Sequence, residues 1–343
     1  MAETEYSTDW SAVQERGSTL GLRFMVTVFR FLGRRICLVL LAPVIGYFFV
    51  TGRGSRKASL DYLTRVSVYR QKNAHPSSNA CFSAPNLWES YCHFYEFGRA
   101  VVDRVALWMG DRNFYLSWHD KQRDEFLKLL DARQGALLLG AHLGNVEVLR
   151  ALSQERFGMR VNAFMYTKHA ASFNTVLRKL NPDSGIRLIP LESVSASTAI
   201  ELNERIAKGE FVSMLADRVA AGSRDRVLTV PFLGKGATFP IGPFIFASLL
   251  NAPVYLIFAL RTGDASYEIH FEKFADRIAI PRKDRESALI ALLHQFVARL
   301  EYYCALAPYQ WFNFYDFWSA SPDAELQQGY SGADRFPVAA GSD

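Results

Sequence analysis

The sequence predicts an α/β layered domain, with a largely parallel mixed sheet flanked by helices and a helical membrane anchor in front of it. From Asp120 onward, short apolar runs alternate with helical patterns, which is typical of parallel strands joined by crossover helices. Half of the 343 residues are hydrophobic, which suffices for a large core. A separate apolar stretch near the N-terminus predicts the anchor.

Residues 1–73 contain that apolar stretch, in "RFLGRRICLVLLAPVIGYFFVTGRGSRK". Its uncharged part runs from Ile36 to Val50 and would be about 23 Å long as a helix, against about 30 Å for a hydrocarbon core. Basic residues stand at both ends, including Arg34 and Arg53. We expect membrane attachment from the cytosolic face, and the pattern leaves open a spanning helix, an in-plane helix or a buried core hairpin.

The remaining chain divides into a predicted α/β domain at 74–320 and a tail at 321–343. The tail is rich in Gly, Ala and Asp and is expected to be disordered. Helices are predicted at 55–72, 87–110, 146–157, 172–180, 195–207, 241–250 and 284–304. Strands are predicted at 136–139, 161–166, 186–191, 211–216, 227–232, 254–260 and 267–271.

Charge and cysteine content narrow the class of protein. The net charge of +5 favours anionic partners such as phospholipid headgroups or an acidic carrier protein. The basic residues gather beside the apolar stretch, which argues against nucleic-acid binding. The four cysteines show no C-x2-C spacing, so we expect neither a metal site nor a disulfide framework.

The stretch "GALLLGAHLGNVEVLRAL" carries two chemically useful residues at the bend between a predicted strand and a predicted helix. The strand should end near Gly140, and Asn145 can cap the helix that follows. His142 then lies at the carboxyl end of a strand, where α/β sheets bind their ligands. Glu147, in the first helical turn, can reach back to a ring nitrogen of His142 and fix its tautomer.

A histidine held in this way suits general-base activation of a hydroxyl or amine that attacks a carbonyl, at a typical gain of about 10²–10⁴ in rate. No G-x-S-x-G motif and no cysteine in the loop supplies a covalent nucleophile, so a direct transfer is favoured. Without further context, an H-x4-E pattern also fits a structural histidine.

With these motifs, the sequence resembles the lysophospholipid acyltransferase superfamily, in its branch of late lipid A biosynthesis acyltransferases. The resemblance covers roughly residues 10–318 and rests on "HLGNVE", "LADR" and "VPFLGKGATFPIGPFIFASLLNAPVYLI". The stretches "ERGS", "ASLDYLTRV" and "PYQWFNFYDFW" are similar to members found in bacterial aryl polyene pigment clusters.

The resemblance implies roles for individual residues. His142 would be the general base and Glu147 its orienting partner, with no covalent enzyme intermediate. The substrate-binding set would comprise Asn145, Asp217, Arg218, Gly234 and Thr238. The chain departs from the glycerol-phosphate enzymes, because it lacks their E-G-T-R motif.

The resemblance also implies partners and a location. An acyl thioester of acyl carrier protein or coenzyme A would be the donor, a lipid or glycolipid hydroxyl the acceptor, and no cofactor would be needed. The enzyme would act on the cytoplasmic face of the bacterial inner membrane. Two alternatives remain from the residues themselves, a thioesterase or hydrolase that activates water and a non-catalytic membrane interaction protein.

Overall fold

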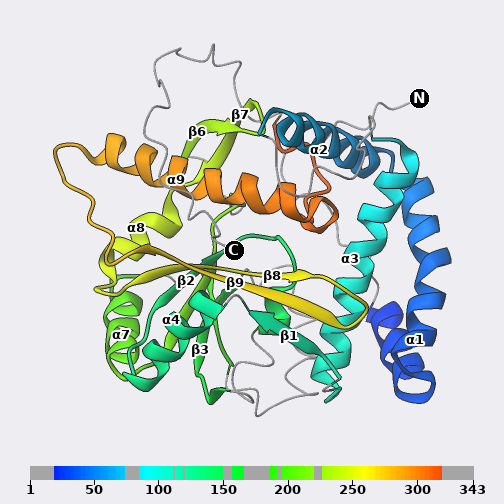
Figure 1. Cartoon of the computed structure of the whole chain (residues 1–343), viewed down its shortest axis with the longest axis horizontal. Coiled ribbons are helices and arrows are strands. Elements are labelled where there is room, and N and C mark those ends of the chain that lie inside the picture. Colours follow the sequence, from blue (N-terminus) through cyan, green and yellow to red (C-terminus); the bar gives the residue numbers. More distant parts are fainter. Residues whose placement is uncertain are drawn as a thin grey trace.

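The computed structural model describes residues 19–73, 85–111, 113–118, 120–149, 157–165, 186–191, 195–219 and 226–318. In this part of the chain, helices flank a mostly parallel seven-stranded sheet, which confirms the predicted layered α/β class (Figure 1). The predicted helix at 172–180 and the predicted tail lie outside the described residues.

The sheet has the strand order β1-β9-β8-β2-β5-β3-β4. Its five strands from β8 to β4 are mutually parallel, and β9 returns antiparallel beside β8. A separate antiparallel hairpin is formed by β6 and β7. The strands are β1 (Tyr115–Trp118), β2 (Leu137–Gly140), β3 (Val161–Met165), β4 (Ile186–Pro190), β5 (Phe211–Leu215), β6 (Val227–Phe232), β7 (Lys235–Pro240), β8 (Val254–Arg261) and β9 (Ser266–Ala275).

Most of the predicted elements in the described part of the chain agree with the structure to within a few residues. Strands β1 and β7 were not predicted, because β1 is a four-residue edge strand with mixed burial and β7 contains glycine, lysine and threonine. The helices are α1 (Thr19–Thr51), α2 (Arg53–Lys72), α3 (Leu87–Trp108), α4 (Asp120–Asp131), α7 (Ala196–Ala207), α8 (Gly242–Leu249) and α9 (Arg285–Leu306), followed by a short 3-10 helix, η4 (Pro308–Gln310).

Alternate residues of the central strands build two cores, one on each face of the sheet. Leu137 and Leu139 of β2 face a core that includes side chains of α2, α7, α8 and α9. Leu138, between them, faces a second core shared with α4 and the end of α3. Both faces of the sheet are therefore buried, which explains why its strands appear in the sequence as continuous apolar runs.

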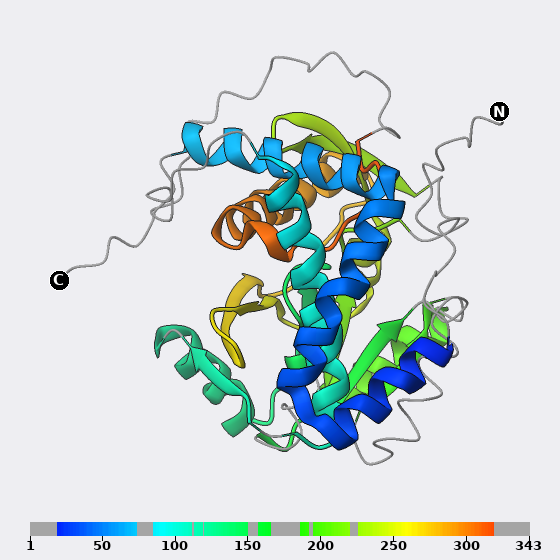
Figure 2. The same ribbon diagram turned by 90° about the vertical axis from the view of Figure 1, so that its right-hand side faces the viewer.

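The N-terminal helices differ in their relation to the core. Helix α1 bends at Gly33, whose φ of 75° is outside helical geometry, and then lies alongside α3 (Figure 2). Among the described helices, the stretch Gly33–Thr51 is long and apolar enough to cross a membrane, with a mean hydropathy of 1.7. Helix α2, in contrast, contributes Tyr62 and Leu63 to the main core.

Glu301 of α9 holds the turn of the β6–β7 hairpin. Its carboxylate accepts a hydrogen bond of 2.5 Å from the backbone N–H of Leu233, a residue with a positive φ of 49°. Burial raises the pKa of Glu301 to about 7, although this hydrogen bond opposes the shift. The folded chain therefore binds a proton near neutrality that the unfolded chain would release.

We expect this acid to make the protein less stable as the pH rises. Stability from protonated Glu301 is complete below the unfolded pKa of 4.5 and is lost as the pH rises through about 7, by about 2–3 kcal/mol. Glu301→Gln keeps an acceptor for Leu233 and should remove this loss, as measured by denaturant unfolding between pH 5 and 8. Glu286→Gln, at an exposed position of the same helix, is the control and should retain it.

Candidate active site

The pairing of β2 with β5 brings His142 opposite Asp217. The two strands are parallel, and Gly140 is the register partner of Leu215. One residue further, the backbone N–H of Ala216 donates to the carbonyl of Gly140 at 3.0 Å. His142 lies two residues beyond Gly140, and Asp217 lies two residues beyond Leu215. The two side chains therefore meet at the same edge of the sheet.

Three hydrogen bonds fix the Asp217 carboxylate. Its Oδ1 lies 2.8 Å from Nδ1 of His142, and its Oδ2 accepts from the backbone N–H of His142 at 3.0 Å and from Nε1 of Trp311 at 3.1 Å. Because an ionised carboxylate only accepts, Nδ1 carries the ring proton. Nε2 of His142 is then the basic nitrogen, on a side chain that is 33% exposed, while Asp217 is fully buried.

The surrounding charges keep this pair in the form that a base requires. Burial, together with the positive charge of Arg218, lowers the pKa of His142 despite the attraction of Asp217, so the imidazole is neutral at pH 7. Burial would raise the pKa of Asp217, but His142 and Arg218 lower it below its ordinary value. The site therefore combines a neutral imidazole with an ionised carboxylate.

The C-terminal segment closes one side of the site. The backbone N–H of Phe312 donates to the carbonyl of His142 at 2.8 Å, and that of Gly144 donates to the carbonyl of Gln310 at 2.9 Å. Between these bonds, Leu143 and Trp311 form an antiparallel bridge. The histidine loop is thus held as an extended segment between Ala259 of β8 and the segment around Trp311.

A buried polar chain holds Trp311 in place. His93 of α3 lies with its Nε2 2.9 Å from the carbonyl of Trp311 and its Nδ1 3.0 Å from the hydroxyl of Ser59 in α2. The Ser90 hydroxyl donates in turn to that of Ser59 at 2.9 Å. Burial lowers the pKa of His93 to about 4, so this histidine is neutral and structural.

Nδ1 of His142 bonds to a carboxylate other than the predicted Glu147. Its partner is Asp217, at 2.8 Å. Glu147 is buried in the first turn of the helix that begins at Val146. The orienting contact of the His142 ring therefore comes from Asp217, just beyond the neighbouring strand β5.

The side chain of Asn145 makes contacts other than the predicted helix cap. Its side chain is 2% exposed and donates to the carbonyl of Ala100 at 3.1 Å and to the hydroxyl of Tyr267 at 3.4 Å. In the described part of the chain it makes no side-chain cap, and only its backbone carbonyl accepts from Val148. Asn145 therefore ties the histidine loop to α3 and β9.

The other predicted substrate-binding residues are spread over two places. Arg218 lies beside Asp217 and donates from Nε to Oδ1 of Asn313 at 2.8 Å and from its terminal nitrogen to the carbonyl of Phe312. Gly234 and Thr238 lie in the β6–β7 hairpin and are not in the hydrogen-bonded set around His142. In the described residues, no three His, Cys, Asp or Glu side chains gather as a metal ion would require.

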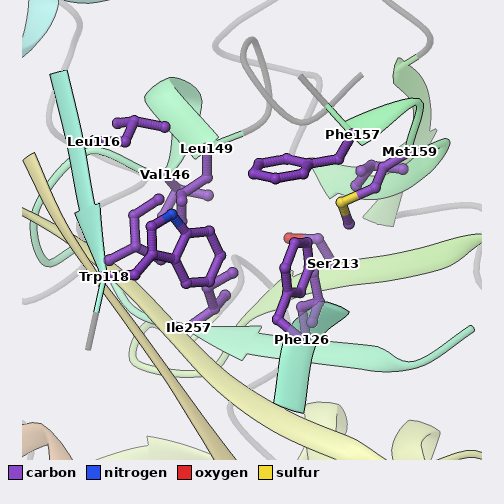
Figure 3. A pocket seen from close by; sticks show the side chains of 12 residues that line it. Leu116, Trp118, Phe126, Val146, Leu149, Phe157, Met159, Ser213 and Ile257 are labelled. Carbon is purple, nitrogen blue, oxygen red and sulfur yellow. The ribbon is translucent and has the colours of Figure 1, made fainter. Parts of the chain in front are cut away.

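An apolar cavity of about 20 Å³ lies beside the helix that follows the histidine loop (Figure 3). Val146 and Leu149 of that helix line it, together with Trp118 and Phe126. Ser213 of β5 contributes a hydroxyl to an otherwise largely apolar lining. In this conformation the cavity has room for about one water molecule.

Gly144 gives a test of the loop geometry. Its φ is +69°, and an added Cβ would lie 2.1 Å from the backbone oxygen of Ala259, which cannot move without breaking β8. Gly144→Ala should lower the free energy of unfolding by more than about 2 kcal/mol, measured with denaturant. Gly242→Ala is the control, because an added Cβ there meets nothing within 4 Å. If Gly144→Ala changed the free energy of unfolding as little as this control does, the described loop would be contradicted.

Comparison with protein families identifies the family of the chain. The model of the bacterial lipid A biosynthesis acyltransferase family matches residues 91–318, more than half of the chain. The match includes most of α3, the histidine loop, β5 and the C-terminal segment that closes the site. No curated protein matches the chain at a significant level. The chain therefore belongs to the bacterial lipid A biosynthesis acyltransferase family and is an acyltransferase.

Proposed function

We propose that the protein transfers an acyl group from a thioester of acyl carrier protein or coenzyme A to a hydroxyl of a lipid or glycolipid, with His142 as general base. The observation that carries the proposal is the hydrogen bond of 2.8 Å between Asp217 and Nδ1 of His142. It leaves Nε2 of a neutral, partly exposed imidazole as the basic atom at the edge of the sheet.

The proposed reaction needs no covalent enzyme intermediate. Nε2 of His142 takes the proton of the acceptor hydroxyl while the hydroxyl oxygen attacks the thioester carbonyl carbon. As the tetrahedral intermediate collapses, the carbon–sulfur bond breaks and the thiolate receives that proton from the imidazolium. Asp217 stabilises the imidazolium during the interval and keeps the ring oriented. The family supports acyl transfer to a lipid acceptor in general.

Asp217 takes the orienting role in this proposal. Glu147 stays a predicted catalytic residue through its place in the H-x4-E pattern, but its contribution has to come from another contact than His142 Nδ1. The position of Arg218 beside Asp217 supports a role for its positive charge next to the anionic intermediate.

The setting of the reaction is also part of the proposal. The apolar stretch of α1 supports action at the cytoplasmic face of the bacterial inner membrane, where an acidic carrier protein would meet a basic enzyme. The stretches "ASLDYLTRV" and "PYQWFNFYDFW" support a narrower assignment to the branch found with aryl polyene pathways. The acceptor would then be a lipid of such a pathway.

The reaction is tested by transfer of a radiolabelled acyl chain from acyl carrier protein into total membrane lipid. His142→Ala should lower formation of the labelled lipid by about 10²–10⁴, with unfolding measured alongside to confirm the fold. Labelled free fatty acid in place of labelled lipid, dependent on His142, would indicate a hydrolase. Equal transfer by both proteins would show that His142 is structural.

A second prediction separates Asp217 from Glu147 as the partner of the histidine. Oδ2 of Asp217 accepts two N–H groups, so in Asp217→Asn the remaining oxygen should stay there and the amide nitrogen should face Nδ1 of His142. Nδ1 must then accept, which moves the ring proton to Nε2 and removes the base.

The tautomer can be read from ¹⁵N chemical shifts of the His142 ring. Asp217→Asn should convert it from the Nδ1–H to the Nε2–H form and reduce transfer by about 10²–10⁴. Glu147→Gln, the matched carboxylate-to-amide change, should leave the tautomer as it is. A tautomer change in Glu147→Gln alone would restore the pairing predicted from the sequence.

A further inference from the structure

We propose that α1 and α3 attach the protein to the surface of one leaflet of an anionic phospholipid bilayer, with α1 lying in the membrane plane and not across it. The inference deepens the membrane setting of the proposed function. It concerns binding alone and does not depend on the acyl-transfer chemistry.

One side of α1 is apolar and exposed after the bend at Gly33. This outer stripe consists of Ile36, Val39, Leu40, Val44, Tyr47 and Val50. The spacing of three, four and seven residues keeps these side chains on one face of the helix. Val39, Tyr47 and Val50 are each about two thirds exposed or more, at 72%, 66% and 69%. No charged residue interrupts the stripe.

The opposite side of α1 is fastened to α3 along its length. The Tyr95 hydroxyl donates to the carbonyl of Leu38 at 3.0 Å, and the Tyr91 hydroxyl donates to that of Ala42 at 3.1 Å. At Gly98 the helices touch so closely that an added Cβ would lie 2.9 Å from the Leu41 side chain. Helix α1 can therefore cross a membrane only if α3 enters the membrane beside it.

Helix α3 is unsuited to that position. It carries Glu96 and Arg99, which pair with each other, and Asp103. Glu96 and Asp103 also each pair with Arg261 of β8. Charged groups are costly in the hydrocarbon core. Its first residues, Leu87 and Trp88, are exposed and apolar, at 60% and 67%. This pattern fits a helix whose first residues touch the membrane interface and whose remaining residues pack against the main domain.

The charges at the ends of the outer stripe favour the same orientation. Arg30 and Arg35 are exposed before it, and Arg53 and Lys57 are exposed after it. A spanning helix would place these two basic groups on opposite sides of the bilayer. An in-plane helix places both at the level of the headgroups, where anionic phosphates attract them.

The membrane surface and the active site are joined by buried polar contacts. Nε of Arg34 in α1 lies 2.8 Å from Asp103, and Asp103 accepts from the hydroxyl of Tyr267. Tyr267 in turn accepts from the side chain of Asn145 in the histidine loop. The outer stripe therefore has a fixed orientation relative to His142.

The orientation is tested by thiol accessibility in inner membranes of a bacterial host. Arg30→Cys and Arg53→Cys are made separately in a full chain whose native cysteines are replaced by alanine. An in-plane helix should let both react with a membrane-impermeant maleimide in inverted vesicles, and neither in intact spheroplasts. Reaction of the two cysteines from opposite sides would overturn the proposal.

A second measurement uses the native chain with one added charge. Val39→Glu should weaken sedimentation with vesicles of phosphatidylglycerol and phosphatidylethanolamine at least tenfold. Ile200→Glu is the matched control, because Ile200 is 63% exposed on α7, and this variant should bind as the native chain does. Equal binding by the two variants would show that the outer stripe is not the membrane contact. Neither readout involves acyl transfer, so failure here leaves the reaction of His142 to be judged separately.

Discussion

The candidate active site depends on the parallel pairing of β2 with β5. Gly140 and Leu215 are register partners at the ends of the two strands, and each chain segment presents its polar side chain two residues later. A shift of one residue would turn the alternating side chains to the opposite face of the sheet and separate His142 from Asp217. The burial of both strands on both faces fixes this register, because every slip would expose apolar side chains to the wrong core.

The pair is completed by a segment that is distant in sequence. Trp311 is buried and packs its indole ring against tilted and edge-on aromatic rings, while its indole N–H donates to the Asp217 carboxylate. A fully buried carboxylate is stable only when its lone pairs accept hydrogen bonds. Here the donors are the backbone N–H and the imidazole of His142 and the indole N–H of Trp311. The aromatic C-terminal segment is thus both core and part of the site.

A buried cluster around Asp103 connects the N-terminal helix to this arrangement. Its carboxylate is fully buried and contacts Arg34 at 2.8 Å, Arg261 at 2.5 Å and the hydroxyl of Tyr267. Loss of one partner from such a cluster leaves an unpaired charge in the interior, so the cluster holds α1, α3 and β8 in one arrangement. Because Tyr267 also accepts from Asn145, the same cluster supports the histidine loop.

The sequence by itself determined the layered α/β class, most strand positions and the place of the candidate base His142 at a strand end, since these follow from local apolar runs and from a polar residue after one of them. It did not determine which carboxylate meets the imidazole. Glu147 is near His142 along the chain, whereas Asp217 is near it only because β5 lies beside β2. Strand order is decided by packing between distant segments, and a single sequence does not show which strands lie side by side. The contact of Trp311 with Asp217 was hidden for the same reason, because 94 residues separate them and only the folded sheet brings them together.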